Sequence, residues 1–163
     1  MDSRPSHRFS ALTEGLLAVL LCEGVGLLAA WATQTSVTTW YPTLAKPAFT
    51  PPDWLFAPVW TVLYAMMGIA AVLVRRSGPG RGRKGALVLF GVQLGMNGAW
   101  SFAFFWARSP AAGGLVIVTL LGVLAWTTVR FFRVRALAGW LLTPYLLWVA
   151  YATALNGAIW LLN

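Results

Sequence analysis

The sequence predicts an all-α integral membrane protein, a five-transmembrane-helix bundle that forms a single domain over residues 1–163. The first observation is composition, since 59% of the residues are hydrophobic and 10% are charged, whereas soluble domains carry about a quarter charged residues. The second is that five apolar runs are long enough for a membrane-spanning helix, which needs about 20 residues. The third is that the charged residues lie between these runs, which argues against nucleic-acid binding despite the net charge of +8.

The five predicted spans follow a polar tail of residues 1–10. They cover residues 12–33, 54–74, 85–106, 112–132 and 136–162. Glycine, proline and serine punctuate the short connections that follow the second and third spans. The first span resembles a signal peptide in having Arg4 and Arg8 upstream, but its apolar run is long and Glu23 interrupts it, so we predict a retained helix.

The basic residues predict the orientation of the bundle. The side that holds the N-terminus has ten lysines and arginines, and the other side has two. Because cytoplasmic connections are enriched in these residues, we expect a cytoplasmic N-terminus, with the C-terminus and the connection of residues 34–53 outside. The bias fits a prokaryotic inner membrane. The ten are Arg4, Arg8, Arg75, Arg76, Arg81, Arg83, Lys84, Arg130, Arg133 and Arg135, and the two are Lys46 and Arg108.

The connection between the first two spans is rich in proline and aromatic residues. Four prolines fall within the eleven residues from Pro42 to Pro52, which prevents a helix and lowers the entropy lost on ordering the loop. Trp40 and Tyr41 beside them suit a membrane interface. Such a loop can cap a ligand pocket between the helices, or it can serve only as an interfacial anchor.

Residues 40–64 read W-Y-x-x-L-x-K-P-x-x-x-P-P-x-W-x-F-x-P-V-W-x-x-L-Y, which resembles the TspO family of tryptophan-rich sensory and translocator proteins. Two further stretches match, N-G-A-W-S-F at residues 97–102 and P-Y-L-L-W at residues 144–148, followed by Ala152 and Thr153. The ten tryptophans and the five spans also fit, and the resemblance covers residues 10–163.

The resemblance implies a ligand pocket that opens toward the first connection. Members of the family bind tetrapyrroles such as protoporphyrin IX, and synthetic isoquinoline carboxamides and benzodiazepines. Some bacterial members degrade protoporphyrin in light and oxygen, some are assigned to the outer membrane, and members form homodimers. No obligatory cofactor is implied, and protoporphyrin IX or haem is the expected ligand. The matched positions are Trp60 and Trp148 in the pocket, Trp40 and Tyr41 in the loop, Asn97 and Ser101 in the third span, and Ala152 in the fifth.

Helical spacing points to the same residues independently. Residues four apart share a face, as do Trp60 and Tyr64, or Trp148 and Ala152. Uncharged polar groups in a span avoid lipid, so these faces can converge on an interior site, or they can only hold the helices together. The candidate ligand-binding residues are Trp40, Tyr41, Lys46, Trp60, Tyr64, Asn97, Trp100, Ser101, Trp148, Ala152 and Asn156.

The remaining reactive groups give weaker signals. Lys46 can pair with a porphyrin propionate or simply reach the membrane interface. Glu23 lies within a span, where a carboxylate is a functional candidate, but no family site matches it. His7 and Cys22 indicate no metal site. Cholesterol binding is doubtful, because no lysine or arginine follows Arg135 to complete a tyrosine-then-basic motif.

A series of small residues at every fourth position marks the third span. At 100° per residue the series lies roughly 145° from the polar face of the same helix. Small residues let helices approach closely in lipid, which predicts either a homodimer interface or packing within the bundle. The series comprises Gly91, Gly95, Ala99, Ala103 and Ala107.

The sequence therefore favours a membrane receptor or sensor for tetrapyrroles. Other flat hydrophobic molecules are expected as further ligands. One alternative is an enzyme that degrades protoporphyrin with Trp60 and Trp148 as redox-active groups, although no conventional catalytic group is present. Another is a small transporter of porphyrins or lipophilic ligands, against which the absence of an inverted repeat argues mildly.

Overall fold

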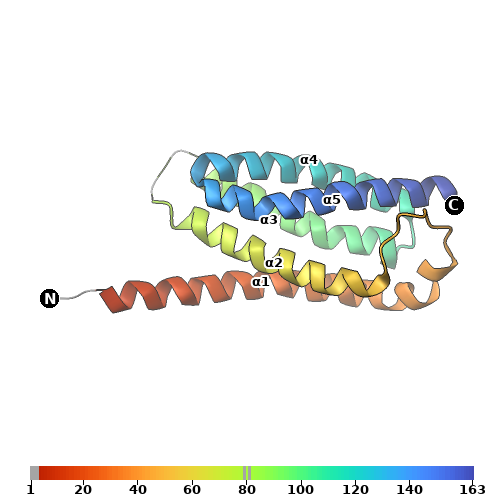
Figure 1. The fold of residues 1–163 in the computed structure, drawn as a ribbon, viewed down its shortest axis with the longest axis horizontal. Helices are drawn as coiled ribbons and strands as arrows, with labels where there is room; N and C mark the ends of the chain where they lie inside the picture. Colours follow the sequence, from red (N-terminus) through yellow and green to blue (C-terminus); the bar gives the residue numbers. More distant parts are fainter. Residues whose placement is uncertain (1–3, 79, 81) are drawn as a thin grey trace.

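A computed structural model of the chain describes the backbone of residues 4–78, 80 and 82–163, with side chains from residue 11 onward (Figure 1). All five long helices within these ranges are long and apolar enough to cross a membrane, and no strand occurs there. The chain is therefore an integral membrane protein built as a five-helix bundle. The elements are α1 (Arg4–Thr39), the 3₁₀ turn η1 (Tyr41–Thr43), α2 (Asp53–Arg75), α3 (Arg83–Ser101), the π-helical segment η2 (Phe102–Trp106), α4 (Pro110–Val134) and α5 (Ala136–Leu162).

Helices α2, α4 and α5, and α3 taken together with η2, begin and end within two residues of the predicted spans, but α1 is longer than predicted. It begins at Arg4, inside the predicted polar tail, and it continues to Thr39, past the predicted end at residue 33. The hydroxyls of Thr33 and Thr39 donate to the carbonyls of Ala29 and Thr35, at 2.7 and 2.6 Å. These hydroxyls find their hydrogen-bond partners within the helix itself.

Close contact between α1 and α2 depends on two glycines. A methyl group at Gly68 of α2 would lie 2.7 Å from the Cα of Val19, and one at Gly26 of α1 would lie 2.5 Å from a ring carbon of Tyr64. In lipid, small residues of this kind allow helices to approach closely and gain dispersion energy. Elsewhere α1 is the least buried of the five helices, so most of its leucines face the membrane.

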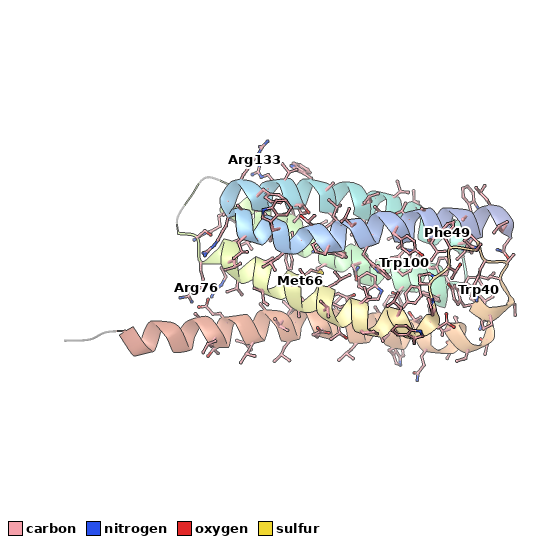
Figure 2. The ribbon with its side chains drawn as sticks, in the orientation of Figure 1. Trp40, Phe49, Met66, Arg76, Trp100 and Arg133 are labelled. Carbon is pink, nitrogen blue, oxygen red and sulfur yellow. The ribbon has the colours of Figure 1, made fainter. Side chains whose placement is uncertain are left out.

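Charged residues collect at one end of the bundle and the aromatic loop lies at the other, as Figure 2 shows with Arg76 and Arg133 opposite Trp40 and Phe49. At the basic end both Arg75 and Arg76 form ion pairs with Glu14 of α1. Of the predicted basic residues, Arg81 and the side chains of Arg4 and Arg8 lie outside the part of the chain that the structure describes, as does the side chain of His7.

Candidate ligand-binding cavity

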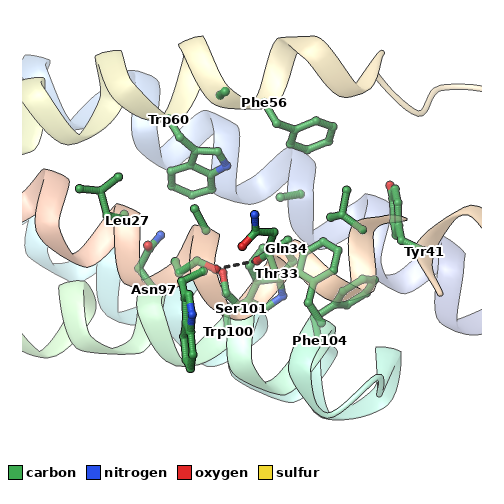
Figure 3. Close-up of a pocket in the computed structure, with 18 of the residues that line it drawn as sticks. Leu27, Thr33, Gln34, Tyr41, Phe56, Trp60, Asn97, Trp100, Ser101 and Phe104 are labelled. Atoms are coloured by element: carbon green, nitrogen blue, oxygen red, sulfur yellow. Dashed lines mark hydrogen bonds between the residues drawn. The ribbon is translucent and has the colours of Figure 1, made fainter. Parts of the chain in front are cut away.

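A cavity of about 780 Å³ lies between α1, α2, α3, η2 and α5, in the half of the bundle near the aromatic loop. Figure 3 shows Phe56 and Trp60 projecting from α2 toward Trp100 and Phe104 on the opposite wall, with Tyr41 at one end. Small-molecule sites typically have volumes of about 300–1,000 Å³ and mostly apolar walls. The lining residues are Glu23, Gly26, Leu27, Ala29, Ala30, Trp31, Thr33, Gln34, Val37, Thr38, Tyr41, Asp53, Phe56, Ala57, Trp60, Thr61, Tyr64, Asn97, Trp100, Ser101, Phe104, Phe105, Ala152, Leu155, Asn156 and Ile159.

Aromatic rings form two opposite walls of the cavity. On α2 the ring of Trp60 lies 5.4 Å from that of Tyr64 and 6.0 Å from that of Tyr145, measured between centroids. On the other wall Trp100 stacks on Phe104 at 5.5 Å. Because these rings support one another, their faces are held in place as stacking surfaces for a flat ligand.

Asn97 of α3 joins three helices beneath the cavity. Its side-chain oxygen accepts a hydrogen bond from the hydroxyl of Tyr64 in α2, and its amide donates to the hydroxyl of Tyr145 in α5, at 2.9 Å. All three side chains are buried. Since an unpaired polar group in a membrane interior is costly, this network fixes the relative positions of α2, α3 and α5 at the cavity.

Asn156 of α5 fixes the opposite wall. Its side-chain oxygen accepts from the indole nitrogen of Trp100 at 3.1 Å, and its amide donates to the carbonyl of Pro110 at 2.7 Å. The first bond sets the plane of the Trp100 ring. The second ties α5 to the start of α4, where Ser109 caps the helix by accepting from the backbone nitrogen of Ala112.

The aromatic loop of residues 40–52 is attached to the bundle at both of its ends. Trp40 packs edge-on against Phe104 at 5.7 Å, and Tyr151 of α5 donates a hydrogen bond of 2.6 Å to the carbonyl of Phe49. Asn163 exchanges two hydrogen bonds of 3.0 Å with the backbone of Ala45. These contacts hold the loop against α5 and η2, beside the cavity.

Tyr41 is the residue of this loop that lines the cavity. Burial, and then the nearby carboxylate of Asp53 and the hydroxyl of Tyr151, raise the pKa of Tyr41 to about 12. The Tyr41 hydroxyl therefore stays protonated at neutral pH and can donate a hydrogen bond. The ammonium of Lys46 lies 4.3 Å from the centre of the Tyr41 ring, a cation–π contact.

Eight of the eleven candidate residues from the sequence line the cavity. Trp40, Lys46 and Trp148 do not. Trp40 and Lys46 contact lining residues through the ring contacts described above, and Trp148 packs edge-on against the lining residue Phe56 at 6.0 Å. The eight are Tyr41, Trp60, Tyr64, Asn97, Trp100, Ser101, Ala152 and Asn156.

The wall formed by α1 was not recognised in the sequence as part of a site. It includes Glu23, which was noted without a role, and also Gly26, Ala30, Gln34 and Thr38. Leucines surround these residues and make the helix resemble any lipid-facing span. The sequence pattern that identifies this wall is the recurrence of small or polar residues every three or four positions, which marks one face of a helix.

No group of three or more histidine, cysteine, aspartate or glutamate side chains that could hold a metal ion is found in the described part of the chain. The chemistry available in the cavity is therefore stacking, hydrogen bonding by amides and hydroxyls, and the charge of two carboxylates, Glu23 and Asp53.

Residues 18–161, which include every residue that lines the cavity, match the TspO/MBR family. The chain belongs to the TspO/MBR family. It is 43% identical over 148 residues to the tryptophan-rich protein TspO of Chlorobaculum tepidum, covering 90% of this chain and 94% of that one. To the tryptophan-rich protein TspO of Archaeoglobus fulgidus it is 40% identical over 152 residues, covering 93% and 96%.

The TspO/MBR relatives also include the translocator protein of Homo sapiens, at 40% identity over 123 residues, or 74% of this chain and 73% of that one. These matches confirm the family that the loop pattern of residues 40–64 indicated, and with it the five-helix architecture. Of the residues that line the TspO/MBR cavity, Trp60 and Ala152 were selected both by the resemblance and by the helical spacing.

Proposed function

We propose that this TspO/MBR protein is a membrane receptor or sensor that binds tetrapyrroles such as protoporphyrin IX. The observation that carries the proposal is the aromatic cavity of about 780 Å³ inside the bundle. A porphyrin is flat and largely apolar, and Trp60 and Trp100 offer indole faces on opposite walls of this cavity. The name of one relative, the tryptophan-rich sensory protein of Cereibacter sphaeroides, supports a sensory role.

The aromatic loop is proposed to cap the bound ligand. It contributes Tyr41 to the lining, and the ammonium of Lys46 lies over the ring of Tyr41. A ligand carboxylate at this end would meet the protonated hydroxyl of Tyr41 and, after a rotation of the lysine side chain, its ammonium. Charge-assisted hydrogen bonds of this type are stronger than neutral ones.

The protein is also proposed to lie in a prokaryotic inner membrane with its N-terminus in the cytoplasm. The described arginines and lysines support this orientation, since seven of them lie at the end of the bundle that holds the N-terminus of α1, and Lys46 and Arg108 lie at the other. Cytoplasmic connections carry such an excess of basic residues.

Binding can be tested with the purified protein and protoporphyrin IX. Quenching of tryptophan fluorescence gives the affinity, and the porphyrin absorption spectrum, followed in the dark and in light, shows whether the pigment is consumed. Saturable binding with an unchanged spectrum is the result expected of a receptor. Light-dependent loss of the pigment would indicate a degrading enzyme instead, and the absence of saturable binding would overturn the proposal.

A further inference from the structure

The charged side chains that line the cavity are both acidic. Glu23 of α1 and Asp53 at the start of α2 are among the lining residues, and no lysine, arginine or histidine of the described chain is. The remaining polar groups are hydroxyls and amides, which are neutral. Charges in a site of low dielectric constant act strongly on a ligand, so this cavity favours positive over negative groups.

Glu23 lies at the inner end of the cavity, away from the aromatic loop. From Glu23 to Thr38 the lining residues of α1 extend over about 22 Å, from the rise of an α-helix. The backbone around Glu23 is held firmly, since α1 contacts α2 at Val19 on one side of it and at Gly26 on the other. The carboxylate is thus attached to a fixed part of the wall.

Glu23 forms no hydrogen bond or ion pair with any residue that the structure describes, which distinguishes it from Glu14. Glu14, nine residues earlier on the same helix, pairs with Arg75 and Arg76 at the membrane surface. A carboxylate within a span is costly unless it is paired, and those that occur usually serve function. The partner that Glu23 lacks within the chain can be supplied by the ligand.

We propose that Glu23 is a specificity-determining residue that selects ligands carrying a cationic amine or another N–H donor at the end that enters the cavity first. This inference rests on the proposed function and deepens it. The ligand class is a flat aromatic molecule that carries a cationic amine or another N–H donor at one edge.

The test compares three porphyrins with the same macrocycle: protoporphyrin IX, its neutral dimethyl ester, and an amide derivative whose two side chains end in primary amines. Affinities are measured by tryptophan quenching with the whole protein in lipid nanodiscs. The wild type is expected to bind the amine derivative about tenfold more tightly than the dimethyl ester, the ratio expected when an ion pair contributes ~1.4 kcal/mol. No variant is needed for this first comparison.

Glu23→Gln is expected to bring the affinities for the amine derivative and the dimethyl ester to within about twofold of each other. The control is Glu14→Gln, which removes a carboxylate of α1 outside the cavity and is expected to keep the tenfold ratio. A wild type without preference for the amine derivative, or a Glu23→Gln protein that retains the full preference, would overturn the inference and leave the proposed function standing. If none of the three porphyrins bound to the wild type, the proposed function would fail and the inference with it.

Discussion

The hydroxyl of Tyr64 on α2 donates a hydrogen bond to the side-chain oxygen of Asn97 on α3, and both side chains are buried. Asn97 in turn donates to Tyr145 on α5. A single amide thus joins three helices at the inner end of the cavity. Because nothing in the hydrocarbon region can replace these partners, the network sets both the stability of the bundle and the shape of the site.

The first prediction concerns this amide. Asn97→Leu removes both bonds and leaves the buried hydroxyls of Tyr64 and Tyr145 without Asn97 as a partner, which costs about 1–3 kcal/mol for each unsatisfied group. We expect a lower melting temperature in detergent and weaker porphyrin binding. Thr119→Val is the control, since Thr119 is exposed on α4 and bonds only to its own helix. Equal melting temperatures for the two variants would contradict the role of Asn97.

The second prediction separates the two tryptophans that the family resemblance places in the pocket. Trp60 lines the cavity, whereas Trp148 supports it through Phe56. Trp60→Ala should weaken porphyrin binding by about 1–3 kcal/mol, by analogy with the stacking of nucleic-acid bases on aromatic rings, and Trp148→Ala should weaken it less. Trp126→Ala, on the exposed face of α4, is the control. A larger loss with Trp148→Ala would mean that the ligand lies elsewhere.

The third prediction concerns space beside the ligand. Ala152 lines the cavity on α5, so a larger side chain there would project into the volume that a porphyrin needs. Ala152→Leu is expected to lower porphyrin affinity without lowering the melting temperature, because it fills open space rather than packed core. Fluorescence titration and thermal unfolding measure the two effects. Unchanged affinity would place the ligand away from α5.

The sequence was sufficient for the fold because five long apolar runs leave few alternatives in a membrane. It was sufficient for much of the cavity wall because polar residues such as Asn97 and Asn156 have few reasons to lie in a span. It failed for α1, where leucines on all sides hide which face is turned inward. The family resemblance assigned Trp148 to the pocket, whereas in the structure Trp148 lies behind the lining residue Phe56. Residues four apart, such as Trp148 and the lining residue Ala152, are offset by about 40° around a helix and so need not share one wall.

The fourth prediction is the orientation in the membrane. In a protein with Cys22→Ala, a single cysteine at Gly80 should resist an impermeant thiol reagent in intact cells and react after lysis, because the connection before α3 is expected in the cytoplasm. A cysteine at Ala45, in the aromatic loop, is the matched control and should react in intact cells. Labelling of position 80 from outside would reverse the proposed orientation.

The fifth prediction is a homodimer through α3. Gly91, Gly95 and Ala99 are exposed on the outer surface of the bundle, and a methyl group added at either glycine would meet no atom within 4 Å. The series of small residues therefore does not pack within its own bundle over these positions. In lipid, such a groove allows a second helix to approach closely, and a two-fold dimer would bury the groove against its own copy.

Gly95→Leu combined with Ala99→Leu should block this approach and yield a folded monomer that still binds porphyrin, since neither residue lines the cavity. Crosslinking in native membranes measures the dimer fraction, and fluorescence titration measures the affinity. The matched control places a leucine at Gly122 on α4, which is also exposed with no atom within 4 Å of an added methyl group. If the double variant crosslinked as fully as this control and the wild type, the interface would lie on another helix.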